Sequence, residues 1–257
     1  LEGADDIQIL NNTITGVRES GGAGQNTACI MGYTSVRVRI EGNTIGGPAP
    51  ADQCDVGIFE KGDHGSGLGG WEMRRNRITN ARWAALHIGG AKSGTTYGRN
   101  IIEDNVLHGR WGVVLRSYDL VSPRALTISN NTIVATDVGI IATGVPPGTP
   151  NPATAPYTDT QIRDNVIVGG LIAINYHWTG AKQGFESNFN VLWAPAVAAS
   201  GYWYTDGAPR YTLTSWQSTM GLDARSQSYD PRLTDYKLPA GSPALTGSST
   251  GGVIGVR

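Results

Sequence analysis

The sequence predicts an all-β protein, built as a solenoid of stacked parallel strands. Two observations favour this fold: a short motif centred on Asn returns along most of the chain, and apolar residues hold fixed positions around each copy. A third is composition, since 36 Gly and 13 Pro among 257 residues make the chain rich in turns. The glycines follow no G-x-y period, which excludes collagen, and seven Trp and ten Tyr need a packed interior, which excludes disorder.

The motif is an Asn followed by two residues, the second of which is Ile or Leu. Its copies lie 25 to 34 residues apart and begin at Asn12, Asn43, Asn76, Asn105, Asn131, Asn165 and Asn190. The residue three positions before the Asn is also apolar in every copy except the last, where it is Ser187. A repeat of this period indicates units that cannot bury an apolar face alone and therefore stack into a common core.

The flanks of each Asn predict two short strands, as in residues 36–40, where apolar and charged residues alternate. We expect the Asn itself to turn the corner between them, because Asn tolerates the left-handed conformation. Stacked Asn amides then form a hydrogen-bonded ladder. The prediction is about seven coils within residues 1–194. A β-sandwich is the alternative, but sandwich strands do not keep one register and one turn residue through seven copies.

The repeat fades after Leu192, and residues 195–257 are predicted to form a C-terminal capping segment, because the open end of a solenoid needs covering. Residues 213–221 predict a short helix within this segment. Thr214 is expected to cap its start, and Gly221 is expected to end it.

The end of the chain resembles that of many secreted bacterial proteins with a right-handed parallel β-helix, the pectate-lyase-like superfamily. The segments that carry the resemblance are SNFNVLW at 187–193, SWQ at 215–217, GLD at 221–223, DPRL at 230–233 and YKLPAGSPA at 236–244. The resemblance implies the right-handed fold and a secreted or extracellular location. It leaves the activity open, because that group contains lyases, hydrolases, epimerases and binding proteins.

Charge and hydrophobicity argue against two classes of partner, nucleic acids and membranes. The net charge of −1 argues against a nucleic-acid partner held by a basic surface, and the apolar runs are too short to insert into a membrane. The first ten residues lack the basic start and apolar stretch of a signal peptide, so the chain is a mature protein or a fragment. The open first coil predicts either further coils before it or the docking of another chain.

The strands that follow the Asn turns can be aligned as rows that begin at Asp55, Arg82, Arg110, Asp137 and Leu171. The third position of each row is small. The last two positions hold most of the candidate functional groups: Glu60, Lys61, His87, Arg116, Tyr176 and His177. Because neighbouring rows are ~4.8 Å apart, these side chains are expected to converge on one face.

Such a face suits a lyase that acts on a uronate-containing polysaccharide. β-Elimination needs a base for the proton next to the carboxylate, and a cation for the enolate that develops. Lys61, His87 and Arg116 are the candidates for these catalytic roles. We expect a Ca²⁺ site at Asp55, Glu60 and Asp63, and polymer contacts from Tyr118, Tyr176 and His177. The alternative is that these charges lie at strand ends and are simply solvated.

Arg82–Trp83 and Arg110–Trp111 occupy matching positions of successive rows. If they face outward, they form an aromatic shelf for sugar rings, with guanidinium groups for carboxylates. If they face inward, the tryptophans belong to the core and the arginines balance Asp55 and Asp137. The second interpretation is slightly favoured, because large aromatic residues in a repeat are more often core.

The competing function is a non-catalytic module, such as a glycan-binding protein, an adhesin or a filament unit. A glycoside hydrolase or epimerase is less favoured, because a hydrolase needs paired carboxylates. The pair Asp5–Asp6 immediately precedes a turn, where a structural corner is expected. Cys29 and Cys54 flank the Asn43 corner and predict either one disulfide or two buried thiols.

Overall fold

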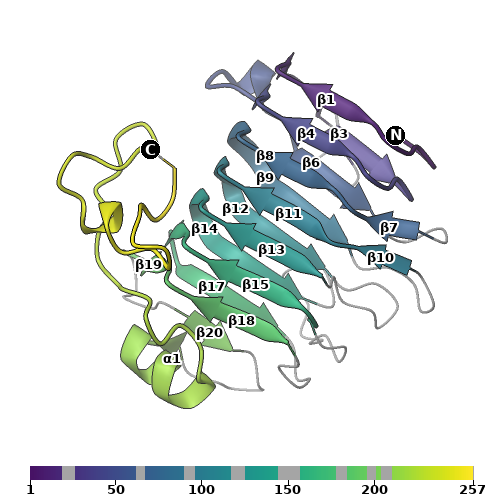
Figure 1. Ribbon diagram of the computed structural model, residues 1–257. Coiled ribbons are helices and arrows are strands. Elements are labelled where there is room, and N and C mark those ends of the chain that lie inside the picture. Colours follow the sequence, from purple (N-terminus) through teal and green to yellow (C-terminus); the bar gives the residue numbers. More distant parts are fainter. Residues whose placement is uncertain are drawn as a thin grey trace.

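The protein is a parallel β-solenoid, as predicted (Figure 1). The computed structural model describes residues 1–18, 27–61, 67–89, 96–116, 125–143, 157–177, 184–195, 201–203 and 210–256. About five complete turns are formed, fewer than the seven predicted. The terminal strand sets are short, such as the two-residue β2 (Thr13–Ile14) and the three-residue β19 (Val191–Trp193). No helix in the described ranges is both long and apolar enough to cross a membrane.

One sheet is formed by the strands that precede the Asn turns. Its seven strands pair in parallel, in the order β1 (Gln8–Leu10), β4 (Arg39–Glu41), β8 (Glu72–Arg74), β11 (Asn100–Glu103), β13 (Leu126–Ser129), β15 (Thr160–Arg163) and β18 (Phe185–Asn188). This order follows the chain, so each turn of the solenoid adds one strand to the sheet.

The strands that follow the Asn turns form a second, larger sheet of twelve strands. These are β2, β3 (Ala28–Tyr33), β5 (Thr44–Ile45), β6 (Val56–Lys61), β9 (Arg77–Gly89), β12 (Val106–Arg116), β14 (Thr132–Thr143), β16 (Val166–Gly169), β17 (Ile172–His177), β19, β20 (Gly201–Trp203) and β21 (Arg210–Tyr211). β7 (Gly67–Gly69) and β10 (Thr96–Gly98) make a separate parallel pair. Two 3₁₀ turns lie at η1 (Pro50–Asp52) and η2 (Pro243–Leu245).

The core lies inside the coils, where the repeat residues stack. Ile78, Leu107, Ile133 and Ile167, each two residues after a motif Asn, are fully buried. The glycines at the third position of three rows, Gly57, Gly112 and Gly139, pack against this column, whereas Ala84 lies in a cluster on the outer face. A Cβ on Gly112 would lie 2.2 Å from the side chain of Ile133, so this position has room for glycine only.

The seven motif asparagines form the predicted ladder along one corner of the coils. Asn76, for example, donates from its backbone N and its Nδ2 to Oδ1 of Asn105, at 2.9 and 3.0 Å. Its Nδ2 also donates to the carbonyl of Ile40 on the preceding coil. At the C-terminal end, Asn190 donates to Ser226 Oγ and to the Asp223 carboxylate, so the last asparagine is also satisfied.

The prediction that these asparagines adopt the left-handed conformation was wrong. The residue immediately before each one has the positive φ instead. These residues have φ between 53° and 67°; they are Asn11, Gly42, Arg75, Asp104, Asn130, Asp164 and Phe189. The preceding residue therefore makes the turn, and the Asn side chain stays free to enter the ladder.

Cys29 and Cys54 form a disulfide that joins the first two coils, with their Cα atoms 5.8 Å apart. The bond lies across 25 residues of sequence, and Cys54 is fully buried while Cys29 packs at the edge of the core. Of the two outcomes expected for these residues, the structure contains the disulfide.

The C-terminal segment begins as a cap over the last coil. The helix α1 (Leu213–Met220) ends at Gly221, which has a φ of 64°, as predicted. Thr212, rather than the predicted Thr214, caps its start, because the Thr212 side chain accepts from the backbone N of Ser215. Trp216 is fully buried and donates to the Asp223 carboxylate, so the helix closes the end of the core.

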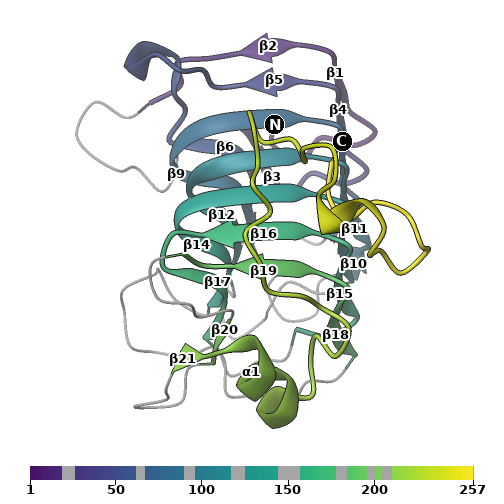
Figure 2. The ribbon, with the colours of Figure 1, turned by 90° about the vertical axis from the view of Figure 1, so that its left-hand side faces the viewer.

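The rest of this segment turns back and runs along the side of the coils (Figure 2). Gly255 donates its backbone N–H to the carbonyl of Asp164, and Val256 donates to Oγ1 of Thr132. Ala244 and Ile254 cover Val166 and a neighbouring valine on the outer face of the second sheet. Residues 222–256 are therefore a strap as well as a cap.

Candidate functional site

The candidate catalytic residues lie on the outer face of the second sheet, on strands β6, β9 and β12. Phe59, His87 and Val114 are in register on these three strands. Two residues further along, Arg116 pairs with Gly89, and Lys61 extends β6 to the same level. Lys61 on β6 and Arg116 on β12 thus lie on either side of Gly89, and His87 lies two residues before Gly89 on β9, between them.

This arrangement corrects the alignment of the rows. His87 was aligned with Glu60 and Tyr176, but it pairs with Phe59 and Val114. Since a shift of one residue moves a side chain to the opposite face, His87 leaves the face of Glu60 and Tyr176 and joins that of Lys61 and Arg116. The cause lies in β9, which has two more residues between Ile78 and Ala84 than β12 has between the partners Leu107 and Trp111, so the row of His87 starts one residue later than it was aligned.

His87 is fully buried between aromatic rings. Its imidazole stacks on Phe59, with centroids 4.1 Å apart and planes 6° apart, and it contacts the ring of Trp83 at 5.1 Å. Neither ring nitrogen has a hydrogen-bond partner within the described ranges. Burial lowers the pKa of His87 well below its usual value, and the charges of Arg116 and Lys61 lower it further. The imidazole is therefore neutral at pH 7.

Tyr33 on β3 holds the side chain of Lys61. The ammonium donates to the Tyr33 hydroxyl at 2.6 Å and lies 4.5 Å from the centre of the ring. Sequence reasoning did not include Tyr33 or Phe59 among the site residues. The register of β3 on β6 would have revealed both, because Tyr33 pairs with Lys61 and Met31 pairs with Phe59.

Trp83 and Trp111 do not form an exposed shelf. Only 3% of Trp83 and 6% of Trp111 is accessible, and their rings meet edge to face with centroids 4.8 Å apart. They belong to a second apolar cluster on the outer face of the sheet, separate from the core inside the coils. The tryptophans therefore face outward, against the inward interpretation, but they are buried against one another and form no accessible shelf.

The two arginines balance Asp55 and Asp137, which is the part of the inward interpretation that the structure confirms. Arg82 contacts the fully buried Asp55 at 2.7 Å, and Arg110 lies 3.6 Å from Asp137. Asp137 also accepts from the indole N–H of Trp111. Both arginines are partly exposed and thus remain accessible at the edge of the cluster.

The carboxylates expected to bind Ca²⁺ are not gathered in one place. Asp55 pairs with Arg82, whereas Glu60 points into the coils and accepts from Nδ2 of Asn100. Asp63 lies outside the described residues. In the part of the chain that the structure describes, no three His, Cys, Asp or Glu side chains come together as a metal site.

Glu60 is a fully buried carboxyl group in the core. Burial raises its pKa to about 8, and the hydrogen bond from Asn100 opposes that rise. Its Oε1 atom has no hydrogen-bond partner among the described residues. Glu60 is therefore protonated at pH 7 and lies on the opposite face of β6 from Lys61.

The three residues expected to contact the polymer differ in position. Tyr176 faces inward and packs against Phe185 and Trp216, with centroids 5.0 and 5.6 Å away. This placement corrects the expectation that it joins the outer face. His177 pairs with Thr143 and so continues the row of Arg116, while Tyr118 lies outside the described residues.

A comparison of the chain with protein-family models, with curated proteins and with solved structures finds no match. The function is therefore argued from this site: a neutral, buried imidazole beside two cations on the outer face of a β-solenoid.

Proposed function

We propose that the protein is an extracellular lyase that cleaves a uronate-containing polysaccharide by β-elimination. The observation that carries the proposal is the neutral imidazole of His87, with the charges of Lys61 and Arg116 close enough to lower its pKa. The disulfide supports the location, because such bonds persist in oxidising compartments. The resemblance of residues 187–244 to secreted β-helix proteins also supports an extracellular location.

Each residue has a role in this reaction. Arg116 and Lys61 hold the uronate carboxylate and stabilise the enolate that forms when the neighbouring C5 proton leaves. His87 takes this proton, because only a neutral imidazole can act as a base. The electrons of the C–H bond form a C4–C5 double bond, the bond from C4 to the glycosidic oxygen breaks, and that oxygen takes up a proton.

This proposal requires the polymer to reach a side chain that is fully buried in the structure. The same burial favours a second candidate function, a glycan-binding module without catalysis. The parallel stacking of His87 on Phe59 is the packing expected of a core aromatic pair. In that case Lys61 and Arg116 bind the acidic polymer, and His87 only supports the sheet.

The test is an assay with a panel of uronate polysaccharides, with and without added Ca²⁺, read as ultraviolet absorbance of unsaturated uronate. We expect a rise that falls at least 100-fold in Lys61→Ala and Arg116→Ala. Arg99→Ala is the matched control, because Arg99 is an exposed arginine paired with Asp159 beside the first sheet, and its rate should stay within twofold. No rise with any polymer contradicts the lyase, and binding without a rise supports the module.

A further inference from the structure

A hollow lies on another part of the larger sheet, away from Lys61 and Arg116. Val134, Val168 and Trp193 are in register on β14, β16 and β19 and form a column along the solenoid axis. Their neighbours Ile133 and Ile167 are fully buried in the coils, so the column faces outward. Each of its three side chains is half-buried. The strap covers the adjacent column at Val166 but leaves this one partly open.

The strap forms the opposite wall of this hollow. Three contacts fix it across the sheet: Tyr236 Oη lies 2.9 Å from Nδ1 of His108, Arg77 pairs with Asp235 at 2.6 Å, and Arg77 also lies over the Tyr236 ring. The space enclosed is about 580 Å³. We call it the strap groove; it lies between Val134, Val168 and Trp193 of the sheet and Asp230, Pro231 and Asp235 of the strap.

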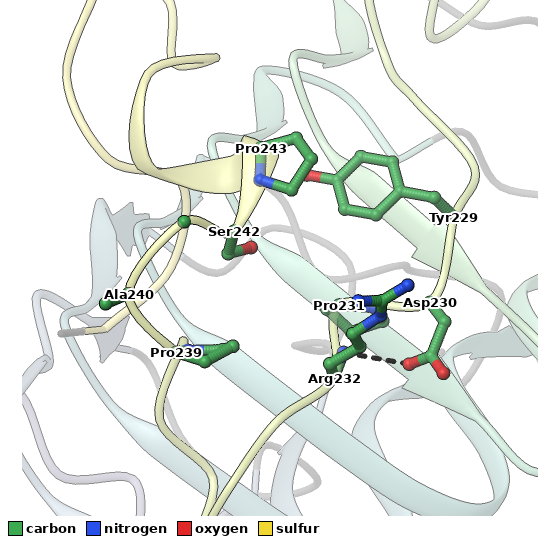
Figure 3. Close-up of a pocket in the computed structure, with 9 residues that line it drawn as sticks. Tyr229, Asp230, Pro231, Arg232, Pro239, Ala240, Ser242 and Pro243 are labelled. Carbon is green, nitrogen blue, oxygen red and sulfur yellow. Dashed lines mark hydrogen bonds between the residues drawn. The ribbon is translucent and has the colours of Figure 1, made fainter.

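Asp230 and Pro231 separate the strap groove from a neighbouring hollow of about 530 Å³, which both residues also line (Figure 3). The Asp230 carboxylate accepts from the backbone N–H of Arg232 at 2.8 Å, which fixes its position between the two hollows. Pro239 and Ser242 lie across this neighbouring hollow (Figure 3). A chain molecule that leaves the strap groove past Asp230 therefore finds a second concave surface.

The chemistry of the strap groove matches an uncharged sugar. A sugar ring has apolar C–H faces and a rim of hydroxyl groups, and the groove has an apolar bed with an indole at one end and two carboxylates on its wall. The carboxylate of Asp235 is already neutralised by Arg77, so it is suited to accept from hydroxyl groups. The described residues of the lining include no Lys or Arg, so none of them compensates the charge of a uronate.

We propose that the strap groove binds one or two rings of an uncharged glycan chain. Trp193 stacks on a ring face, and Asp230 and Asp235 accept from hydroxyl groups. This site is distinct from the face of Lys61 and Arg116, and it goes beyond the proposed lyase activity. A polymer with both acidic and neutral sugars could occupy both faces, but binding in the groove does not depend on cleavage.

The test is calorimetric titration of the whole chain with the neutral pentasaccharides of cellulose, xylan, mannan and starch, and with pentagalacturonate as the charged probe. We expect at least one neutral probe to bind. We expect an excess of pentagalacturonate to leave the affinity for that neutral probe unchanged, because the charged probe does not enter the groove. Trp193→Ala should weaken binding of the neutral probe at least tenfold, and Asp230→Asn severalfold.

Leu171→Ala is the matched control, because Leu171 is a large apolar side chain, 41% exposed and outside the groove lining. Its affinity for the neutral probe should stay within twofold, and thermal melts should show all three variants folded. The proposal is overturned if no neutral probe binds at millimolar concentration, or if Trp193→Ala binds as tightly as the parent chain. The absorbance assay on Lys61→Ala is independent, so the two proposals fail separately.

Discussion

The asparagine ladder and the region around Glu60 and His87 both bury polar side chains, but they do so differently. In the ladder, each internal Asn donates to the next Asn and to a backbone carbonyl, as Asn105 does to Asn131 and Met73. In the second region, Glu60 Oε1 and both nitrogens of His87 have no hydrogen-bond partner within the described ranges. Glu60, His87 and every asparagine of the ladder after Asn12 are buried.

This difference separates structure from candidate function. A satisfied buried polar group stabilises the fold, whereas an unsatisfied one costs stability and calls for an explanation in function. The ladder repeats with every coil, while Glu60 and His87 each occur once. The comparison therefore predicts opposite effects of mutation in the two regions.

The largest effect on the free energy of unfolding is expected from a change of pH that ionises Glu60. The pKa of Glu60 is about 8 in the folded chain against 4.5 in the unfolded chain, so between these values only the folded state holds the proton. Stability from this group is thus fully present below pH 4.5 and is lost as the pH rises toward 8. At ~1.4 kcal/mol per pKa unit, the loss is on the order of 5 kcal/mol.

Urea unfolding of the parent chain and of Glu60→Gln at pH 5 and pH 8 measures this loss. The Gln variant keeps the shape and a hydrogen-bonding oxygen for Asn100, but it cannot ionise. We expect it to be more stable than the parent chain at pH 8 and to lose less stability between the two pH values. Equal pH dependence in the two proteins would show that Glu60 is not the titrating group.

The next effect is expected in the ladder. Asn105→Ala removes the oxygen that accepts from the backbone N and Nδ2 of Asn76, and it leaves buried donors without partners. At ~1–3 kcal/mol for each unsatisfied group, unfolding should become easier by about 3 kcal/mol. Asn12→Ala, at the exposed first position of the ladder, is the matched control and should cost under about 1 kcal/mol. Similar losses at the two positions would contradict a buried ladder.

Much of this fold could be predicted from the sequence. The period of the Asn motif indicated a parallel solenoid, and the fading repeat after Leu192 indicated a separate end segment. The motif also indicated the ladder, but not the corner, because an Asn that binds through its side chain leaves the turn to the residue before it. The return of residues 222–256 along the coils could not be foreseen, because no repeat or pattern marks the surface that they cover.

The site was predicted less well, because the sequence pattern does not show which side chains of a row face outward. Rows such as residues 55–61 are apolar on both faces, so hydrophobicity could not show which side chains face outward. The extra residues of β9 between Ile78 and Ala84 then shifted the row of His87 by one residue. The prediction gathered Lys61, His87 and Arg116, which do share a face, but it added Glu60 and Tyr176, which lie on the other face.

The smallest effect on stability is expected from His87→Phe. This variant is also the most direct test of the central claim, that His87 is the base of a lyase. The new ring keeps the stack on Phe59 and removes two buried nitrogens without partners, so the free energy of unfolding should stay equal or rise by about 1 kcal/mol. Lyase activity, measured on the same samples by absorbance of unsaturated uronate, should fall at least 100-fold, because the base is gone. A folded His87→Phe protein with full activity would contradict a catalytic role for His87.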